Sequence, residues 1–125
     1  PDAAHAFAAG APEAGMRVLI AAAGMSAALP GVLAAQTPLP VIGVPMASGP
    51  LAGADAALSI MQMPPGVPVG CMAIGKAGAK NAALYAAAVL ALGDDDLAKR
   101  LADYRAAQAK KVVASDAELR REAGQ

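Results

Sequence analysis

The chain has 125 residues, of which 57% are hydrophobic and 2% aromatic, and its ten basic side chains balance ten acidic ones. This length suits one domain with its own hydrophobic core. A protein that binds nucleic acid carries a basic stripe or patch, so the zero net charge argues against a nucleic-acid partner. The composition predicts a globular protein whose core consists of alanine and aliphatic side chains.

Helix and strand signals alternate along the first part of the chain. Residues 1–15 are rich in alanine, which predicts a helix. The continuous apolar run at 17–22 is typical of a strand buried on both faces. A helix is predicted at 26–36, and a second buried strand at 39–45.

The same alternation continues with a helix at 51–63, a strand at 67–74 and a long alanine-rich helix at 77–92. Strands that alternate with helices indicate a parallel sheet covered by helices on both faces. The sequence therefore predicts an α/β fold, a three-layer α/β/α sandwich. Three strands are few for such a sheet, so we expect a further strand–helix–strand unit before residue 1.

The C-terminal part differs in kind, because most of the charged residues of the chain lie in it. Leu97, Leu101 and Tyr104 recur at the spacing of one helix face. We predict an α/β domain at 1–93 and an amphipathic helical tail at 94–125. The apolar face of the tail either meets solvent or packs on a neighbouring subunit.

No charged residue lies between Arg17 and Asp55. Prolines and glycines interrupt this stretch, so no unbroken apolar segment reaches the ~20 residues that a membrane-spanning helix needs. Uncharged turns are unusual on the surface of a monomer, which predicts a homo-oligomer. Cys71 is the single cysteine, and the chain shows no signal-peptide pattern, so we expect no membrane association and a cytoplasmic location.

The segment AAAGMSAALPG at 21–31 has the character of a ligand-binding loop between a strand and a helix. It contains no acidic residue, histidine, lysine or cysteine, and Ser26 is its only reactive side chain. Ser26 either caps the following helix or contacts a ligand, and the backbone N–H groups at 24–29 would suit an anion. No catalytic residue can be identified. The candidate substrate-binding residues are Gly24, Met25, Ser26, Ala27, Ala28 and Leu29.

Other reactive side chains point less clearly to a site. The segment GCMAIGKA at 70–77 has the G-x-x-x-x-G-K spacing of a phosphate loop, but we read its middle as strand and reject a nucleotide site. His5 is the only histidine and is expected on a surface or interface. Asp55 is expected to cap a helix or to interact with its dipole. No cluster has metal-ligand spacing, so no metal is predicted.

The segment at 39–92 resembles the PurE proteins of purine biosynthesis, most specifically in QMPPGVPV and GAKNAAL. Pro1 and Asp2 resemble the residues that follow the family's Ser-Ala-His-Arg-Thr segment. The family's first strand, its Ser-Asp loop and that histidine segment would therefore precede residue 1. The resemblance implies a flavodoxin-like fold, a homo-octamer, an aminoimidazole ribonucleotide-type substrate and no cofactor.

The resemblance also implies formation of 4-carboxy-5-aminoimidazole ribonucleotide. Class I enzymes transfer the carboxylate from the N5-carboxyamino compound and carry the loop Gly-Gly-Ala-Ala-His-Leu-Pro-Gly. Class II enzymes take carbon dioxide and carry Gly-Arg-Ser-Asn. Here Ala28 occupies the histidine position of class I, while Ser26 matches the serine of class II. The carboxylate source stays open, and the alternative function is a non-catalytic PurE-like scaffold or engineered assembly subunit.

Overall fold

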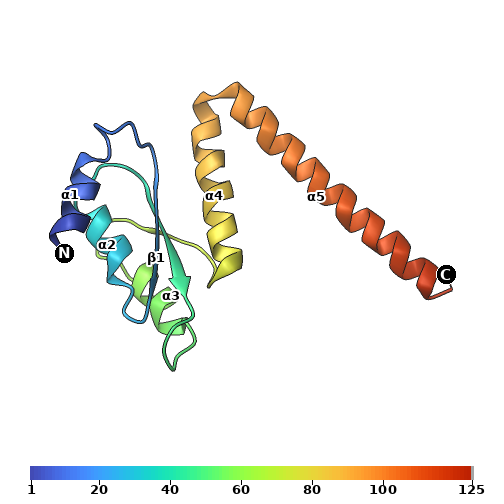
Figure 1. Cartoon of the computed structure of the whole chain (residues 1–125), viewed down its shortest axis with the longest axis horizontal. Helices are drawn as coiled ribbons and strands as arrows, with labels where there is room; N and C mark the ends of the chain where they lie inside the picture. The colour runs from blue at the N-terminus through green and yellow to red at the C-terminus, as the bar shows by residue number, and fades with distance from the viewer. Residues whose placement is uncertain (125) are drawn as a thin grey trace. The chain divides into compact units, whose positions relative to one another are not determined.

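The computed structural model describes residues 1–124, and helices and strands alternate along it (Figure 1). The chain forms two compact units, Pro1–Ala86 and the segment from residue 87 onward. The elements in chain order are α1 (Asp2–Gly10), β1 (Leu19–Gly24), α2 (Ala28–Ala34), β2 (Val41–Met46), α3 (Ala54–Met61), β3 (Gly70–Cys71), α4 (Lys76–Leu90), the 3-10 helix η1 (Ala91–Gly93) and α5 (Asp95–Glu122).

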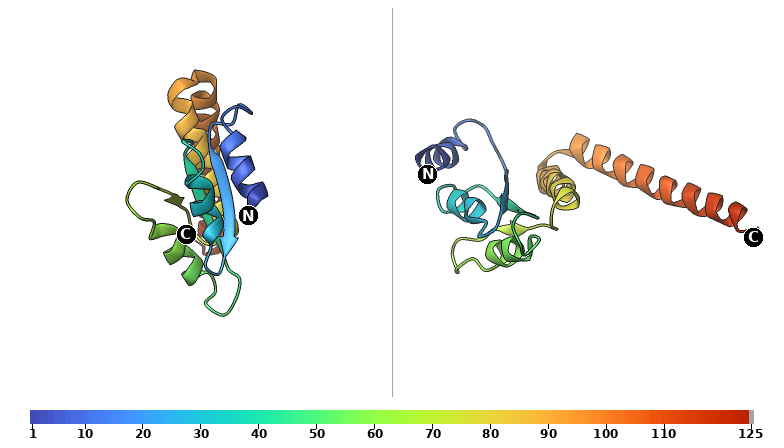
Figure 2. Two further views of the ribbon diagram at one scale, coloured as in Figure 1. Left: turned by 90° about the vertical axis from the view of Figure 1, so that its left-hand side faces the viewer. Right: turned by 60° about the horizontal axis from the view of Figure 1, so that its bottom comes forward.

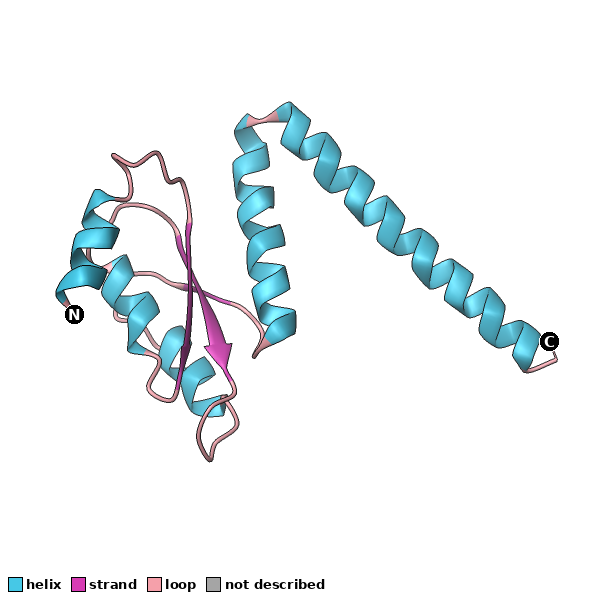
Figure 3. Ribbon diagram, viewed as in Figure 1, coloured by secondary structure: helices cyan, strands magenta, loops and turns pink. Residues whose placement is uncertain are grey.

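The three strands of the first unit form one parallel sheet in the order β1-β2-β3 (Figure 3). Leu19 of β1 pairs with Val41 of β2, and the register continues to Gly24 and Met46. The predicted parallel sheet is therefore confirmed. All three strands end at one edge of the sheet, where an open α/β fold binds its ligands.

Helices cover both faces of the sheet (Figure 2). On one face α1 and α2 pack on β1 and β2, and on the other face α4 packs on β2. This confirms the predicted three-layer α/β/α sandwich. The buried residues of the first face are Ala8, Ala11, Leu19, Ala21, Leu33 and Val41, and those of the second are Ile42, Val44, Ala82 and Ala86.

Gly43 in the middle of β2 lets α3 approach the sheet closely. A Cβ atom at this position would lie 2.6 Å from Cγ2 of Ile60 and 3.3 Å from Cβ of Pro30. Real Cβ atoms essentially never come as near to another heavy atom as the first of these distances. The small residues of this sequence thus bring α3 close enough for Ile60, 2% exposed, to fill the space over the strand.

The strand predicted at 17–22 lies at Leu19–Gly24, and the prediction that both its faces are buried is wrong within this chain. Leu19 and Ala21 are buried, whereas the alternate residue Ile20 is 46% exposed. The reason is its position: β1 is an edge strand among the described residues, and α4 covers β2 on that face. Strand β2, in the middle of the sheet, has the continuous burial that was predicted.

The strand predicted at 67–74 is much shorter in the structure, where β3 contains only Gly70 and Cys71. Beyond it, the backbone N–H of Gly75 donates to the carbonyl oxygen of Pro45 at 2.8 Å. Pro45 has no N–H to donate in return, so β2 cannot continue the ladder along this side. Pro45 inside the central strand β2 therefore limits the length of the neighbouring strand β3.

The predicted helices are present with shorter bounds. The one expected at 1–15 ends as α1 at Gly10, the one at 26–36 is α2, and the one at 51–63 is α3. In α2 and α3 the residue before the helix, Ala27 or Gly53, has a positive φ, which belongs to a turn and not to a helix. The long helix expected at 77–92 is α4 followed by η1.

The second unit contains α5, which extends over 28 residues. Asp94 caps its start by accepting a hydrogen bond from the backbone N–H of Leu97 at 2.9 Å. None of its residues is buried within the described chain. No helix in residues 1–124 combines the length and the apolar character that crossing a membrane requires.

Candidate functional site

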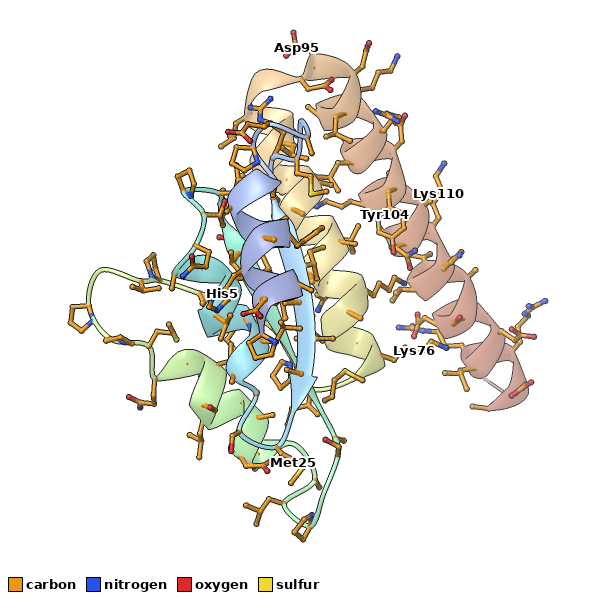
Figure 4. The ribbon with its side chains drawn as sticks, turned by 60° about the vertical axis from the view of Figure 1, so that its left-hand side comes forward. His5, Met25, Lys76, Asp95, Tyr104 and Lys110 are labelled. Atoms are coloured by element: carbon orange, nitrogen blue, oxygen red, sulfur yellow. The ribbon has the colours of Figure 1, made fainter. Side chains whose placement is uncertain are left out.

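The carboxyl edge of the sheet brings three connecting segments together: 25–27 after β1, 47–53 after β2 and 72–75 after β3. A Cβ atom on Gly53 would lie 2.8 Å from Cγ2 of Ile74, and one on Gly49 would lie 3.5 Å from Cγ of Met25. Figure 4 shows Met25 on its loop, Lys76 at the start of α4, and His5 on α1, apart from this edge. This edge is the candidate binding site.

The first segment forms a tight turn with an unusual backbone. The backbone N–H of Ala27 donates to the carbonyl oxygen of Gly24 at 2.9 Å. Met25 and Ala27 have φ angles of 55° and 40°, in the left-handed region that residues other than glycine rarely adopt. Ala27 therefore occupies the N-cap position, and the prediction that Ser26 caps the helix is wrong because the turn delays the helix start.

The six predicted site residues form this turn and the first turn of α2, but they do not share one environment. Ala27 is 6% exposed and packs on Ala56 and Ile60 of α3, so it can offer a ligand only its backbone. Met25 is 58% exposed, Leu29 is 39% exposed, and Ser26 and Ala28 are exposed as well. The N–H groups of Ala28 and Leu29 have no acceptor within α2, because they begin it.

The loop after β2 contributes Ser48, which sequence reasoning missed. A Cβ atom on Gly24 would clash with the hydroxyl oxygen of Ser48, so this hydroxyl packs closely against the Gly24 backbone. Ser48 is exposed, and its own N–H donates to the carbonyl oxygen of Met46 at 2.9 Å. A glycine at a strand end indicates a close approach, but nothing in the sequence names the group that approaches.

Sequence reasoning also missed Ser59 on α3. Its hydroxyl group donates a hydrogen bond to the carbonyl oxygen of Ser26. Ser59 lies three residues after Ala56 and one before Ile60, the two α3 residues that pack on Ala27. The spacing places Ser59 on the helix face of Ala56, but the contact of this face with the turn arises only in the tertiary fold.

The remaining candidate residues are less central. Asp55 lies in the first turn of α3 but makes no capping hydrogen bond, so its predicted capping role is wrong and its position at the helix dipole is as expected. Partial burial raises the pKa of the Cys71 thiol, which suits an inert thiol and not a nucleophile. Within residues 1–124 no three His, Cys, Asp or Glu side chains group as metal ligands would.

These features define a class: a flavodoxin-like α/β protein with an open, parallel sheet, at whose carboxyl edge a loop offers mainly backbone groups to a ligand. The family model described as AIRC, AIR carboxylase, matches residues 1–111. The chain belongs to this family, which confirms the resemblance to the PurE proteins.

Named relatives agree with the family match. The chain is 60% identical over 113 residues to N5-carboxyaminoimidazole ribonucleotide mutase of Brucella melitensis, covering 90% of this chain and 70% of the relative. It is 54% identical over 113 residues to the Escherichia coli enzyme of the same name, covering 90% and 67%. It is 50% identical over 124 residues to the Mycobacterium tuberculosis enzyme of that name, covering 99% and 70%.

Proposed function

We propose that this protein is an N5-carboxyaminoimidazole ribonucleotide mutase. The observation that carries the proposal is the family match over residues 1–111 together with relatives of that name at 50–60% identity. In the reaction the carboxylate leaves N5 and forms a bond to C4 of the imidazole, and the C4 proton is lost while N5 gains one. Direct carboxylation by carbon dioxide is the competing carboxylate source.

The substrate would bind at the carboxyl edge of the sheet, with the turn at 24–29 holding it. This part of the site would be lined by three kinds of group: the exposed residues Ser26 and Ala28, the backbone of Gly24 and Ala27, and the side chains of Met25 and Leu29. None of these groups carries a proton readily, so the segment binds and orients the substrate. The proton carrier would come from outside the turn.

Ala28 offers the sharpest test of the carboxylate source. It stands where class I enzymes carry a histidine, and it is exposed, so an imidazole has room there. If the mutase lacks a proton carrier equivalent to the class I histidine, Ala28→His should supply it and raise turnover of the N5-carboxy compound by ~10²–10⁴-fold, whereas a carrier outside the turn would leave turnover of that compound unchanged. The full-length protein is assayed with each carboxylate source, and Ala3→His, an exposed position on α1, is the control.

Each other result of this assay has a definite meaning. Wild-type turnover of carbon dioxide that Ala28→His does not improve would contradict the mutase and favour the carboxylase. No turnover by either protein with either source would favour the alternative of a non-catalytic scaffold. An equal gain from Ala3→His would show that the added imidazole acts without being positioned.

The proposed function includes a cytoplasmic homo-octamer in which the tail at 94–125 packs on a neighbouring subunit and 1–93 forms the α/β domain. Two observations support self-association. Large apolar side chains are exposed in the sheet unit, among them Ile20 and Phe7, and α5 exposes Val112 and Val113. Light scattering at micromolar concentration should give the mass of an assembly, and a monomer would contradict it.

A further inference from the structure

Helix α3 presents one face to the turn at 24–29. Ala56 and Ile60 on this face are 0% and 2% exposed and pack on Ala27, which is 6% exposed. Ser59 lies between them in sequence and donates its hydroxyl hydrogen to the carbonyl oxygen of Ser26. The helix thus holds two successive residues of the turn, one by packing and one by a hydrogen bond.

The peptide group that joins Ser26 to Ala27 is held at both ends. Its N–H donates to the carbonyl oxygen of Gly24 at 2.9 Å, and its carbonyl oxygen accepts from Ser59. The residues at Met25 and Ala27 have positive φ, a conformation that persists in residues other than glycine only when the surroundings enforce it. Without the hydroxyl of Ser59, this peptide group keeps only its local hydrogen bond.

We propose that Ser59 is a positioning residue for substrate binding, which keeps the turn at 24–29 in its left-handed conformation by holding the Ser26 carbonyl against α3. It acts through the turn and does not touch the substrate. This proposal rests on the proposed function, because that function assigns the turn to the substrate. A turn that samples other conformations binds more weakly in proportion to the fraction that is competent to bind.

If Ser59 served only to stabilise the fold, Ser59→Ala would lower the melting temperature of the protein. Ser59 is exposed, and alanine is the better helix former, so removal of the hydroxyl would leave α3 at least as stable. The substitution Ser59→Ala therefore separates positioning from folding. Ser59→Thr keeps a hydroxyl, and its added methyl group lies at an exposed position, so it serves as the rescue variant.

The experiment uses the full-length protein with Ser59→Ala, Ser59→Thr and, as matched control, Ser115→Ala, which removes an exposed hydroxyl from α5. Since a hydrogen bond is worth ~0.5–1.5 kcal/mol, we expect Ser59→Ala to raise KM by about 2- to 13-fold with kcat unchanged. Hydrogen exchange of the Ala27 amide should become faster, and the melting temperature should not fall. Ser59→Thr should restore both readouts, and Ser115→Ala should change neither.

The proposal is overturned if Ser59→Ala leaves KM and the exchange of the Ala27 amide at wild-type values. It is also overturned if KM rises only together with a fall in melting temperature that Ser59→Thr does not reverse. The exchange measurement needs no catalysis. Suppose that Ser59→Ala exchanges the Ala27 amide faster but the protein turns over neither carboxylate source. This result would support the role of Ser59 in holding the turn and would contradict the proposed function.

Discussion

Helices α3 and α5 form for different physical reasons. The shorter, Ala54–Met61, buries Ala56 and Ile60 against its neighbours, and its residues make no side-chain cap at its start. The longer, Asp95–Glu122, buries no residue within the described chain but has a capped start, acidic residues in its first turn and basic residues in its last. Tertiary packing dominates in α3, whereas the cap and the charges at both ends are the main stabilising features of α5. The apolar residues on one face of α5 are only half-buried, namely Leu97, Leu101 and Tyr104.

This difference separates what each helix can contribute to function. Packing fixes α3 to the sheet through Gly43 and to the turn at 24–29 through Ala27, so it can hold a binding loop in one conformation. Local interactions each contribute only a few tenths of a kcal/mol to ~1 kcal/mol, and they do not orient a helix against anything. Since α5 buries no residue within the described chain, its contact with another molecule stays a proposal.

The largest effect should come from Ile60→Ala. Ile60 is 2% exposed and lies in the space that Gly43 opens, so its truncation leaves a cavity. We expect the free energy of unfolding to fall by ~2–5 kcal/mol, measured by urea denaturation of the full-length protein. Ala27 should also lose its support, so its amide should exchange faster.

Leu58→Ala on the same helix is the matched control, because Leu58 is 58% exposed. Its truncation should cost much less than that of Ile60 if α3 packs through one face only. Equal losses from the two substitutions would break the comparison. They would mean that the exposed face of α3 is covered in the assembled protein.

The sequence predicted the fold well because its apolar runs are continuous and its helices are rich in alanine. The sandwich and the parallel sheet followed from these patterns, whereas the family followed from the resemblance of segments such as QMPPGVPV and GAKNAAL to the PurE proteins. The edges of elements were harder to predict. The end of β3 depends on a missing N–H at Pro45, and the exposure of Ile20 depends on which strand α4 covers, so each depends on a residue or element distant in the sequence.

The candidate site was predicted as a loop but not as a set of contacts. The turn at 24–29 carries the glycine signal of a strand end, and the structure places it at the carboxyl edge of the sheet. Ser48 and Ser59 come from separate segments and reach the turn only through the tertiary fold. The left-handed φ angles of Met25 and Ala27 were invisible, since neither residue type favours that region.

After the loss of stability in Ile60→Ala, the second largest effect is expected from removal of the cap of α5. Asp94 accepts a hydrogen bond from the N–H of Leu97 at 2.9 Å, and loss of such a cap costs ~1 kcal/mol. We expect Asp94→Ala to speed hydrogen exchange at Leu97 and to lower the helical signal in circular dichroism, while Asp94→Ser retains both. The unfolding of the sheet unit should not change. A loss of global stability would show that α5 is specified by packing after all.

The smallest effect belongs to the ion pair between Asp116 and Arg120. Oδ2 of Asp116 lies 2.9 Å from Nε of Arg120, one helical turn away, and the two side chains are 59% and 67% exposed. An exposed pair with the acid on the N-terminal side contributes ~0.3–0.5 kcal/mol at low salt, and added salt screens it. Asp116→Asn should therefore lower helicity slightly in dilute buffer and have no effect at about 1 M salt, where the Debye length is ~3 Å. If the loss is large and persists in salt, the pair lies in an interface from which water is excluded. The end of α5 would then be buried by a partner, and it would resemble α3 in being stabilised by packing.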